Sequence, residues 1–329
     1  MISTARHIPV LLPTVLKSLG SIDGALIIDA TFGAGGYSRA FLEKGAQVIG
    51  FDRDPNAIRD GAGLVSSFAP RLRLIHSPFS ELDQKVKENV DAIVFDIGVS
   101  SMQIDEDARG FSFQKDGPLD MRMAQSGFSA ADVINFFKQS DLTRIFGLLG
   151  EERHAGRVAR MVVSRRSERP FLTTLDLSQA IANLLGRKPN DPIHPATRVF
   201  QALRIYVNDE LGQLAQGLFA AERLLKPNGR LAVVTFHSLE DRMVKKFFTA
   251  RAGGAAPSRY LPEIAPITPS FLPLFKGGKT ADNAEVSMNP RARSARLRVG
   301  IRQNAPAHEA DMRIFNLPTL PIFMKGAIK

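Results

Sequence analysis

Cysteine and tryptophan are both absent from the 329 residues of the sequence. Without cysteine there are no disulfides, no thiolate metal ligands and no cysteine nucleophile. The six histidines are scattered and form no HExxH pattern, so we expect no metal site. No apolar run approaches the roughly 18 residues of a membrane-spanning helix, and two prolines interrupt the N-terminal apolar patch, unlike in a signal peptide. We therefore expect a cytoplasmic protein that makes no membrane contact.

Acidic residues are outnumbered by basic ones. The chain has 43 Lys and Arg residues against 33 Asp and Glu residues, which gives a formal net charge of +10 and a pI of about 10.0. This excess would attract a polyanionic partner such as nucleic acid, although a protein can be basic without binding one.

Short apolar runs alternate with helical stretches in the first hundred residues. The runs cover residues 25–29, 47–51, 72–76 and 91–96. They are apolar throughout, as in parallel strands that helices cover on both faces. Strands that alternate with helices predict an α/β fold built on a parallel sheet.

After Asp96 the strand pattern stops and helical patterns follow, with capping signals at Ser129…Asp132 and Thr173…Asp176. A strand pattern returns at 230–238, residues 253–285 predict a long loop, and 294–301 predicts a closing edge strand. We predict four parts: the first part of a sheet domain (1–106), an inserted all-helical domain (107–200), the second part of the sheet domain (201–302) and a C-terminal tail (303–329).

The stretch "DATFGAGGYS", which begins at Asp29, follows the first predicted strand and opens a helix. Gly33, Gly35 and Gly36 would let backbone N–H groups approach a bound cofactor. Asp52 ends the second strand, where a carboxylate can accept hydrogen bonds from ribose hydroxyls. The negative charge of Asp29 would repel a pyrophosphate and attract a sulfonium, which favours S-adenosylmethionine over NAD. The alternative is a purely structural turn in which Asp29 caps the helix.

Two further residues lie where ligands bind in such sheets. Phe79 follows the third strand and could stack on an adenine ring, or simply pack in the core. Asp96 ends the fourth strand, where it could act on the substrate or cap the next turn.

Several blocks closely resemble those of the small-subunit ribosomal RNA methyltransferase H family. Among them are "DIGVSSMQ" (96–103), "GPLDMRM" (117–123), "HPATRVFQALRI" (194–205) and "TFHSLEDR" (235–242). The resemblance extends to about residue 300. Thr14 departs from it, because an acidic residue is expected there.

The resemblance implies a class I S-adenosylmethionine-dependent methyltransferase (Rossmann-like) with an inserted all-helical domain. It implies methylation of N4 of a decoding-centre cytosine in 16S ribosomal RNA, in the RNA itself or in the assembled small subunit. It also implies S-adenosylmethionine as the cofactor, held by Gly35, Gly36, Tyr37, Asp52, Phe79, Asp96 and Gln103.

The amino group of cytosine is a poor nucleophile, so an acceptor for its N–H would help it to attack the methyl group. We predict that Asp96, or a backbone carbonyl beside it, is this acceptor and that His237 or Asp241 assists. The alternative for the last two is structural, because Ser238 and Asp241 have the spacing of a helix-capping box.

Two arginine clusters predict contacts to RNA phosphates, although such runs are often only solvated surface. We predict that one lies on a helix and one near the sheet edge: Arg153, Arg157, Arg160, Arg165 and Arg166, with Arg291 and Arg293.

Three alternatives remain open at this point. The chain could be a NAD-dependent oxidoreductase, a non-catalytic RNA-binding protein, or a methyltransferase with another RNA or amine acceptor. We expect a monomer or a weak homodimer.

Overall fold

The computed structural model describes residues 9–186, 193–253 and 268–322. Two compact units are present, one formed by residues 1–98 and 211–316 and the other by residues 99–210 and 317–329. The predicted domains divide the chain at 106/107 and 200/201 instead, and that division stays a prediction.

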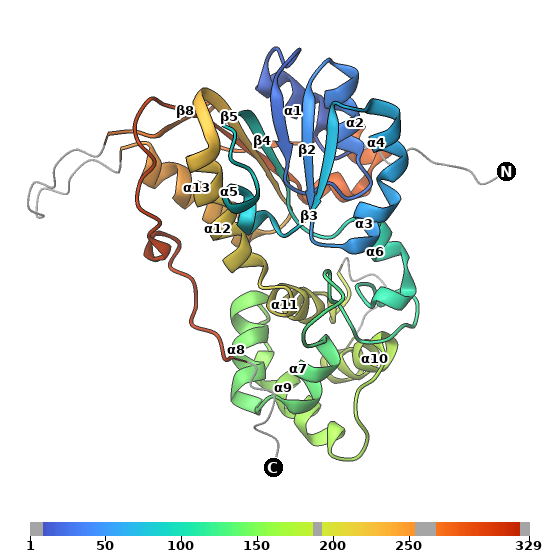
Figure 1. Cartoon of the computed structure of the whole chain (residues 1–329). Coiled ribbons are helices and arrows are strands. Elements are labelled where there is room, and N and C mark those ends of the chain that lie inside the picture. The colour runs from blue at the N-terminus through green and yellow to red at the C-terminus, as the bar shows by residue number, and fades with distance from the viewer. Residues whose placement is uncertain (1–8, 187–192, 254–267, 323–329) are drawn as a thin grey trace, which may run out of the picture. The chain divides into compact units, whose positions relative to one another are not determined.

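The first unit is built on one mixed sheet (Figure 1) with the strand order β3-β2-β1-β4-β5-β8-β6, and β7 also pairs with β8. The strands are β1 Leu26–Asp29, β2 Gln47–Asp52, β3 Leu72–His76, β4 Val90–Asp96, β5 Leu225–Thr235, β6 Phe271–Pro273, β7 Lys279–Thr280 and β8 Arg296–Arg302. The first five are parallel, whereas β8 runs antiparallel to β5. This arrangement confirms the predicted α/β, Rossmann-like fold class.

Helices cover both faces of this sheet, which explains why its central strands are apolar throughout. Ala92 and Val94 of β4 lie in a core cluster together with side chains of α1 and α2. On the opposite face, Phe95 lies close to α12, and Gly300 of β8 lies against α13. The helices attached to this sheet are α1 Leu12–Leu19, α2 Gly36–Glu43, α3 Pro55–Asp60, α4 Ala62–Phe68, α5 Leu82–Lys85, α12 Glu210–Leu224, α13 Ser238–Arg251 and α14 Asn283–Met288, with the 3-10 turns η1 Phe79–Glu81, η3 Pro290–Ser294 and η4 Met312–Phe315.

The end of the sheet differs from the sequence-based expectation. The predicted edge strand is β8, but it lies inside the sheet, between β5 on one side and β6 and β7 on the other. Both extra strands fall in the stretch 253–285 that was predicted to be a loop, of which 254–267 lies outside the described residues. These two strands are too short to show the alternation of apolar and polar residues that indicates a strand.

The second unit is helical over the part of it that the structure describes. Its elements are α6 Ser101–Asp105, η2 Asp107–Arg109, α7 Ala130–Phe136, α8 Gln139–Leu149, α9 Ala155–Arg166, α10 Thr174–Leu185 and α11 Thr197–Val207. The predicted capping box of Ser129 and Asp132 is confirmed, and Thr173 caps α10. Within the described ranges, no helix is both long and apolar enough to cross a membrane.

A pair of glycine substitutions tests the packing of α13 on β8. A Cβ at Gly300 would lie 2.2 Å from Cε1 of Phe248, whereas one at Gly63 on α4 would meet no atom within 4 Å. We expect Gly300→Ala to lower the free energy of unfolding by about 1–3 kcal/mol through overpacking. Gly63→Ala should raise it by up to about 1 kcal/mol, because alanine restricts the unfolded chain. Denaturant unfolding of both variants measures the difference, and equal effects would contradict the described packing.

Candidate active site

The turn after β1 brings backbone N–H groups to the carboxyl edge of the sheet. Its residue Gly35 has φ +76° and is the N-cap of α2, and no side chain caps this helix. A Cβ at Gly35 would lie 2.8 Å from Cζ of Phe32, so glycine is required there. Because first-turn N–H groups have no acceptors inside a helix, those of Gly36 and Tyr37 suit a polar ligand.

Tyr37 can offer a ligand only its backbone. Its side chain is buried in the core, and its hydroxyl donates a hydrogen bond to the carbonyl of Val10.

Asp29 is completely buried at the end of β1. Its Oδ2 accepts a hydrogen bond of 2.7 Å from the Ser38 hydroxyl on α2, and its Oδ1 accepts one of 3.3 Å from the N–H of Thr31. Burial raises the pKa of Asp29 to about 6, despite these hydrogen bonds. Asp29 therefore joins the strand to the helix and holds a negative charge, or a proton, below the glycine turn.

Asp52 fixes the glycine turn from the neighbouring strand. Its Oδ2 accepts from the N–H of Gly33 at 2.8 Å, and its Oδ1 accepts from the N–H of Asp54 at 2.8 Å. Burial raises the pKa of Asp52. Each carboxylate oxygen has a second lone pair, so Asp52 can still accept hydrogen bonds from ribose hydroxyls.

Asp96 carries an unsatisfied buried oxygen at the end of β4. Its backbone N–H donates to the Thr31 hydroxyl at 2.7 Å, but its Oδ1 has no hydrogen-bond partner among the described residues. Burial, together with the negative charges of Asp29 and Glu240, raises the pKa of Asp96 well above its ordinary value. Buried polar atoms are almost always hydrogen-bonded, so this oxygen fits a donor on a ligand.

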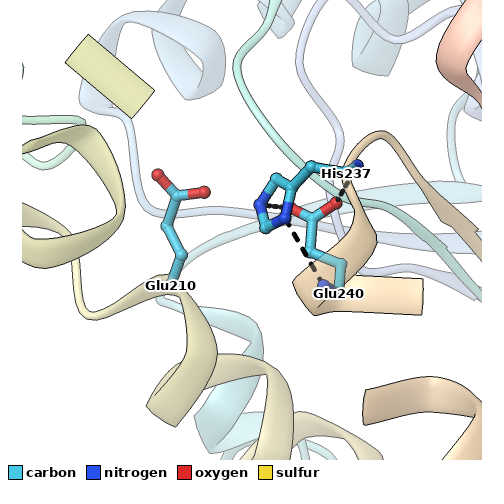
Figure 2. Close-up of side chains that lie close together, drawn as sticks. All are labelled: Glu210, His237 and Glu240. Atoms are coloured by element: carbon cyan, nitrogen blue, oxygen red, sulfur yellow. Dashed lines mark hydrogen bonds and ion pairs between the residues drawn. The ribbon is translucent and has the colours of Figure 1, made fainter. Parts of the chain in front are cut away.

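His237 and Glu240 form the start of α13, as Figure 2 shows. The capping box is thus His237 with Glu240, one residue earlier than the predicted pair of Ser238 and Asp241. Nδ1 of His237 accepts from the N–H of Glu240 at 3.4 Å, and the Glu240 carboxylate accepts from the N–H of Phe236 at 2.8 Å. In a neutral ring the proton then sits on Nε2, which lies 3.0 Å from Oε1 of Glu240, although the two atoms are not aligned as a hydrogen bond.

Glu240 was missed by the sequence analysis. It is completely buried next to a predicted catalytic residue, and its charge acts on Asp96. The signal was present as His-x-x-Glu, but Ser238 is the commoner kind of N-cap residue.

Asp241 forms a bidentate ion pair with an arginine of β8. Its Oδ1 accepts from Nε of Arg298 at 2.7 Å, and its Oδ2 accepts from Nη2 at 2.9 Å. This bidentate pair ties α13 to the sheet. We therefore propose a structural role, and no catalytic role, for Asp241.

Phe79 has the contacts of a core residue. Its half-buried ring lies edge-on to that of Phe95, with centroids 5.3 Å apart, and a Cβ at Gly217 would come within 2.8 Å of it. Its contact with adenine stays a prediction. So does the cofactor contact of Gln103, which lies in the second unit and completes a capping box with Ser100.

The helical arginines divide into two groups. Arg153, Arg157 and Arg160 are exposed, although Arg153 precedes α9, so only the other two of these lie on the helix that was predicted to carry them. Arg165 and Arg166 are half-buried and have short contacts to structural partners, whereas exposed Arg157 makes one longer contact, of 3.4 Å, to the carbonyl of Leu184.

Nη2 of Arg165 donates to Asp176 at 2.5 Å, and its guanidinium lies 3.9 Å from the centroid of Phe171. Arg166 donates to the carbonyls of Ile134 and Phe137 at 2.5 and 2.6 Å. On η3 of the first unit, Arg291 is half-buried and Arg293 is exposed.

Acidic residues at the ends of β1, β2 and β4, around a glycine turn, define the class: a Rossmann-like enzyme of the class I methyltransferase type. The model of the MraW methylase family matches residues 4–303, and the chain belongs to this family. With this fold, membership of a methylase family identifies S-adenosylmethionine as the cofactor. It also argues against a NAD-dependent oxidoreductase.

Curated relatives match along almost their full length. The Ribosomal RNA small subunit methyltransferase H of Bartonella tribocorum is 64% identical over 321 residues, which cover 98% of this chain and 97% of that protein. The protein of the same name from Brucella anthropi is 61% identical over 324 residues, with coverage of 96% and 93%.

The raised pKa of Asp29 predicts that the free energy of unfolding depends on pH. In the unfolded chain the pKa is near 3.8 and in the folded protein about 6, so the folded state is favoured at low pH and this stability is lost as pH rises through 6. Relative to the isosteric Asp29→Asn variant, the free energy of unfolding of the wild type should fall by about 2 kcal/mol between pH 4 and pH 7. Denaturant unfolding of both proteins across this range measures the difference. Parallel stability curves would show that Asp29 keeps an ordinary pKa.

Proposed function

We propose that this protein transfers the methyl group of S-adenosylmethionine to N4 of a decoding-centre cytosine in 16S ribosomal RNA, in the cytoplasm. The names of its curated relatives support small-subunit ribosomal RNA as the substrate. The observation that carries the chemistry is the unpartnered Oδ1 of Asp96 at the carboxyl edge of the sheet.

The residues of the glycine turn fit the cofactor. The uncapped first turn of α2 offers N–H donors, and Asp52 keeps lone pairs for ribose hydroxyls. The negative charges of Asp29 and Asp96 favour a cationic ligand. We assign the cofactor contacts to Gly35, Gly36 and Tyr37 through their backbone, and to Asp52, Phe79, Asp96 and Gln103. When bound, S-adenosylmethionine supplies an electrophilic methyl group.

Asp96 would accept a hydrogen bond from the cytosine amino group. This contact withdraws the nitrogen lone pair from the ring and points it away from the carboxylate, which prepares the nitrogen for attack. The base has to leave its stack to reach a carboxylate at this depth. We propose that His237 is the second residue that contacts the cytosine amino group. Glu240 holds the His237 ring in place through the helix cap.

For RNA binding we propose the exposed arginines Arg153, Arg157 and Arg160, with Arg291 and Arg293. We leave out Arg165 and Arg166, because both guanidinium groups already have partners inside the helical unit. We further propose that the protein acts as a monomer or a weak homodimer.

The Asp96→Asn variant tests the proposed acceptor. Asparagine keeps the size of the side chain but removes the charge, so we expect methyl transfer at saturating S-adenosylmethionine to fall about 100-fold or more, while S-adenosylmethionine still binds, but more weakly. In the wild type, activity should rise with pH through the raised pKa of Asp96, because only the ionised form accepts fully. Radiolabelled methyl transfer to unmethylated small subunits, followed by mapping of the nucleotide, measures both.

Wild-type turnover by Asp96→Asn would contradict the role of Asp96. A methyl group mapped to another base would contradict the proposed substrate and favour another RNA acceptor.

Charge reversal tests the helical arginines. We expect Arg157→Glu/Arg160→Glu to lower RNA methylation roughly tenfold near 0.1 M salt, and less at high salt, because phosphate contacts are screened. A matched control is Lys85→Glu/Lys87→Glu, two exposed lysines of the first unit, one at the end of α5 and one just after it. Equal activity of the two variants would remove the helical arginines from the RNA-binding surface.

A further inference from the structure

The positive charge of the chain is concentrated in one segment. Residues 211–316 carry 16 Lys and Arg residues against 8 Asp and Glu residues, whereas residues 99–210 carry 15 against 14 and residues 1–98 carry 10 against 11. The sheet unit therefore holds most of the excess, and the helical insertion is nearly balanced.

Part of this excess lies at the carboxyl edge of the sheet. Arg296 of β8 pairs with Thr235, the last residue of β5, and with Thr280 of β7. Asp96 pairs with Val234 on the other side of β5. Since neighbouring strands are about 4.8 Å apart, β7 lies roughly 14 Å along this edge from the strand that carries Asp96. A few nucleotides of RNA span such a distance.

The turn between β6 and β7 reads Lys276-Gly277-Gly278-Lys279 and is built around Arg296. A Cβ at Gly278 would lie 2.4 Å from Cγ of Arg296, so the glycine lets the turn lie directly against the arginine stem. Gly277 has φ +74°, a conformation that favours glycine. Lys276 and Lys279 are both exposed, with Nζ of Lys279 only 5.4 Å from the ring centroid of Phe275.

Three of the four cations lack acidic partners among the described residues, whereas Nη1 of Arg296 lies 3.9 Å from Oδ2 of Asp241. Within the part of the chain that the structure describes, no carboxylate oxygen lies within 4.0 Å of the side-chain nitrogens of Lys276, Lys279 or Arg293. The nearby acids are used elsewhere: Asp282 caps α14, and Glu285 accepts from the N–H of Leu11. Unpaired, exposed cations beside a reaction site are what a phosphate backbone binds.

We propose that Lys276, Lys279, Arg293 and Arg296 form a phosphate-binding surface that holds the RNA backbone next to the reacting cytosine. The proposal rests on the proposed function, which already includes Arg293, and it extends that RNA-binding surface along the sheet edge to Lys276, Lys279 and Arg296. Contacts to phosphate are blind to sequence, so this surface positions the strand and leaves recognition of the base to the pocket.

The test is the salt dependence of RNA binding by the full chain, measured by fluorescence anisotropy with a labelled single-stranded RNA. Each phosphate contact to a single strand contributes about 0.7 to the slope of log K against log salt. We expect Lys276→Gln/Lys279→Gln to reduce this slope by about 1.4. If the wild type and this variant bind RNA equally at 1 M salt, the variant should bind about 25-fold more weakly at 0.1 M salt.

Two controls make the result decisive. Lys85→Gln/Lys87→Gln removes the same charge from the C-terminal end of α5 and the residues just after it, and should keep the wild-type slope. Lys276→Arg/Lys279→Arg should keep it as well. Binding of S-adenosylmethionine by all variants checks that they are folded. Equal slopes for the two glutamine pairs would overturn the proposal, whereas failure of the wild type to methylate ribosomal cytosine would overturn the proposed function instead.

Discussion

The repulsion among buried carboxyl groups at one edge of the sheet is the constraint on which the site depends. Asp29 and Asp96 end neighbouring parallel strands, and Glu240 begins the helix that follows β5. The charges of Asp29 and Glu240 both raise the pKa of Asp96. An arrangement of this kind lowers the stability of the empty protein, and a bound cation would offset the cost.

The surrounding structure holds these groups in place rather than neutralising them. Thr31 contacts two of these residues, since its N–H donates to the carboxylate of Asp29 and its hydroxyl accepts from the backbone N–H of Asp96. Ser38 ties Asp29 to α2. Arg298 pairs with Asp241, which follows Glu240 in the first turn of α13, and not with Asp29 or Asp96. The carboxyl edge therefore keeps its negative potential for a ligand, while exposed cations flank it on β7 and β8.

The sequence was sufficient for the features that local pattern determines. The parallel strands were predicted because buried strands are apolar throughout, and the glycine turn and Asp29, Asp52 and Asp96 follow directly from them. The interior position of β8 was not predictable, because its partner β7 has only two residues in a stretch rich in glycine and proline. Likewise, Arg166 reads as a free surface charge until the fold brings it to carbonyls about 30 residues away in the chain.

The most direct test of the central claim is the proton balance of cofactor binding. Calorimetry at pH 6 in buffers of different ionisation enthalpy gives the number of protons released. If buried, partly protonated carboxyls receive the sulfonium, S-adenosylmethionine should release protons on binding, and S-adenosylhomocysteine, which lacks that charge, should release fewer. Equal release for both ligands, or none for either, would contradict the account.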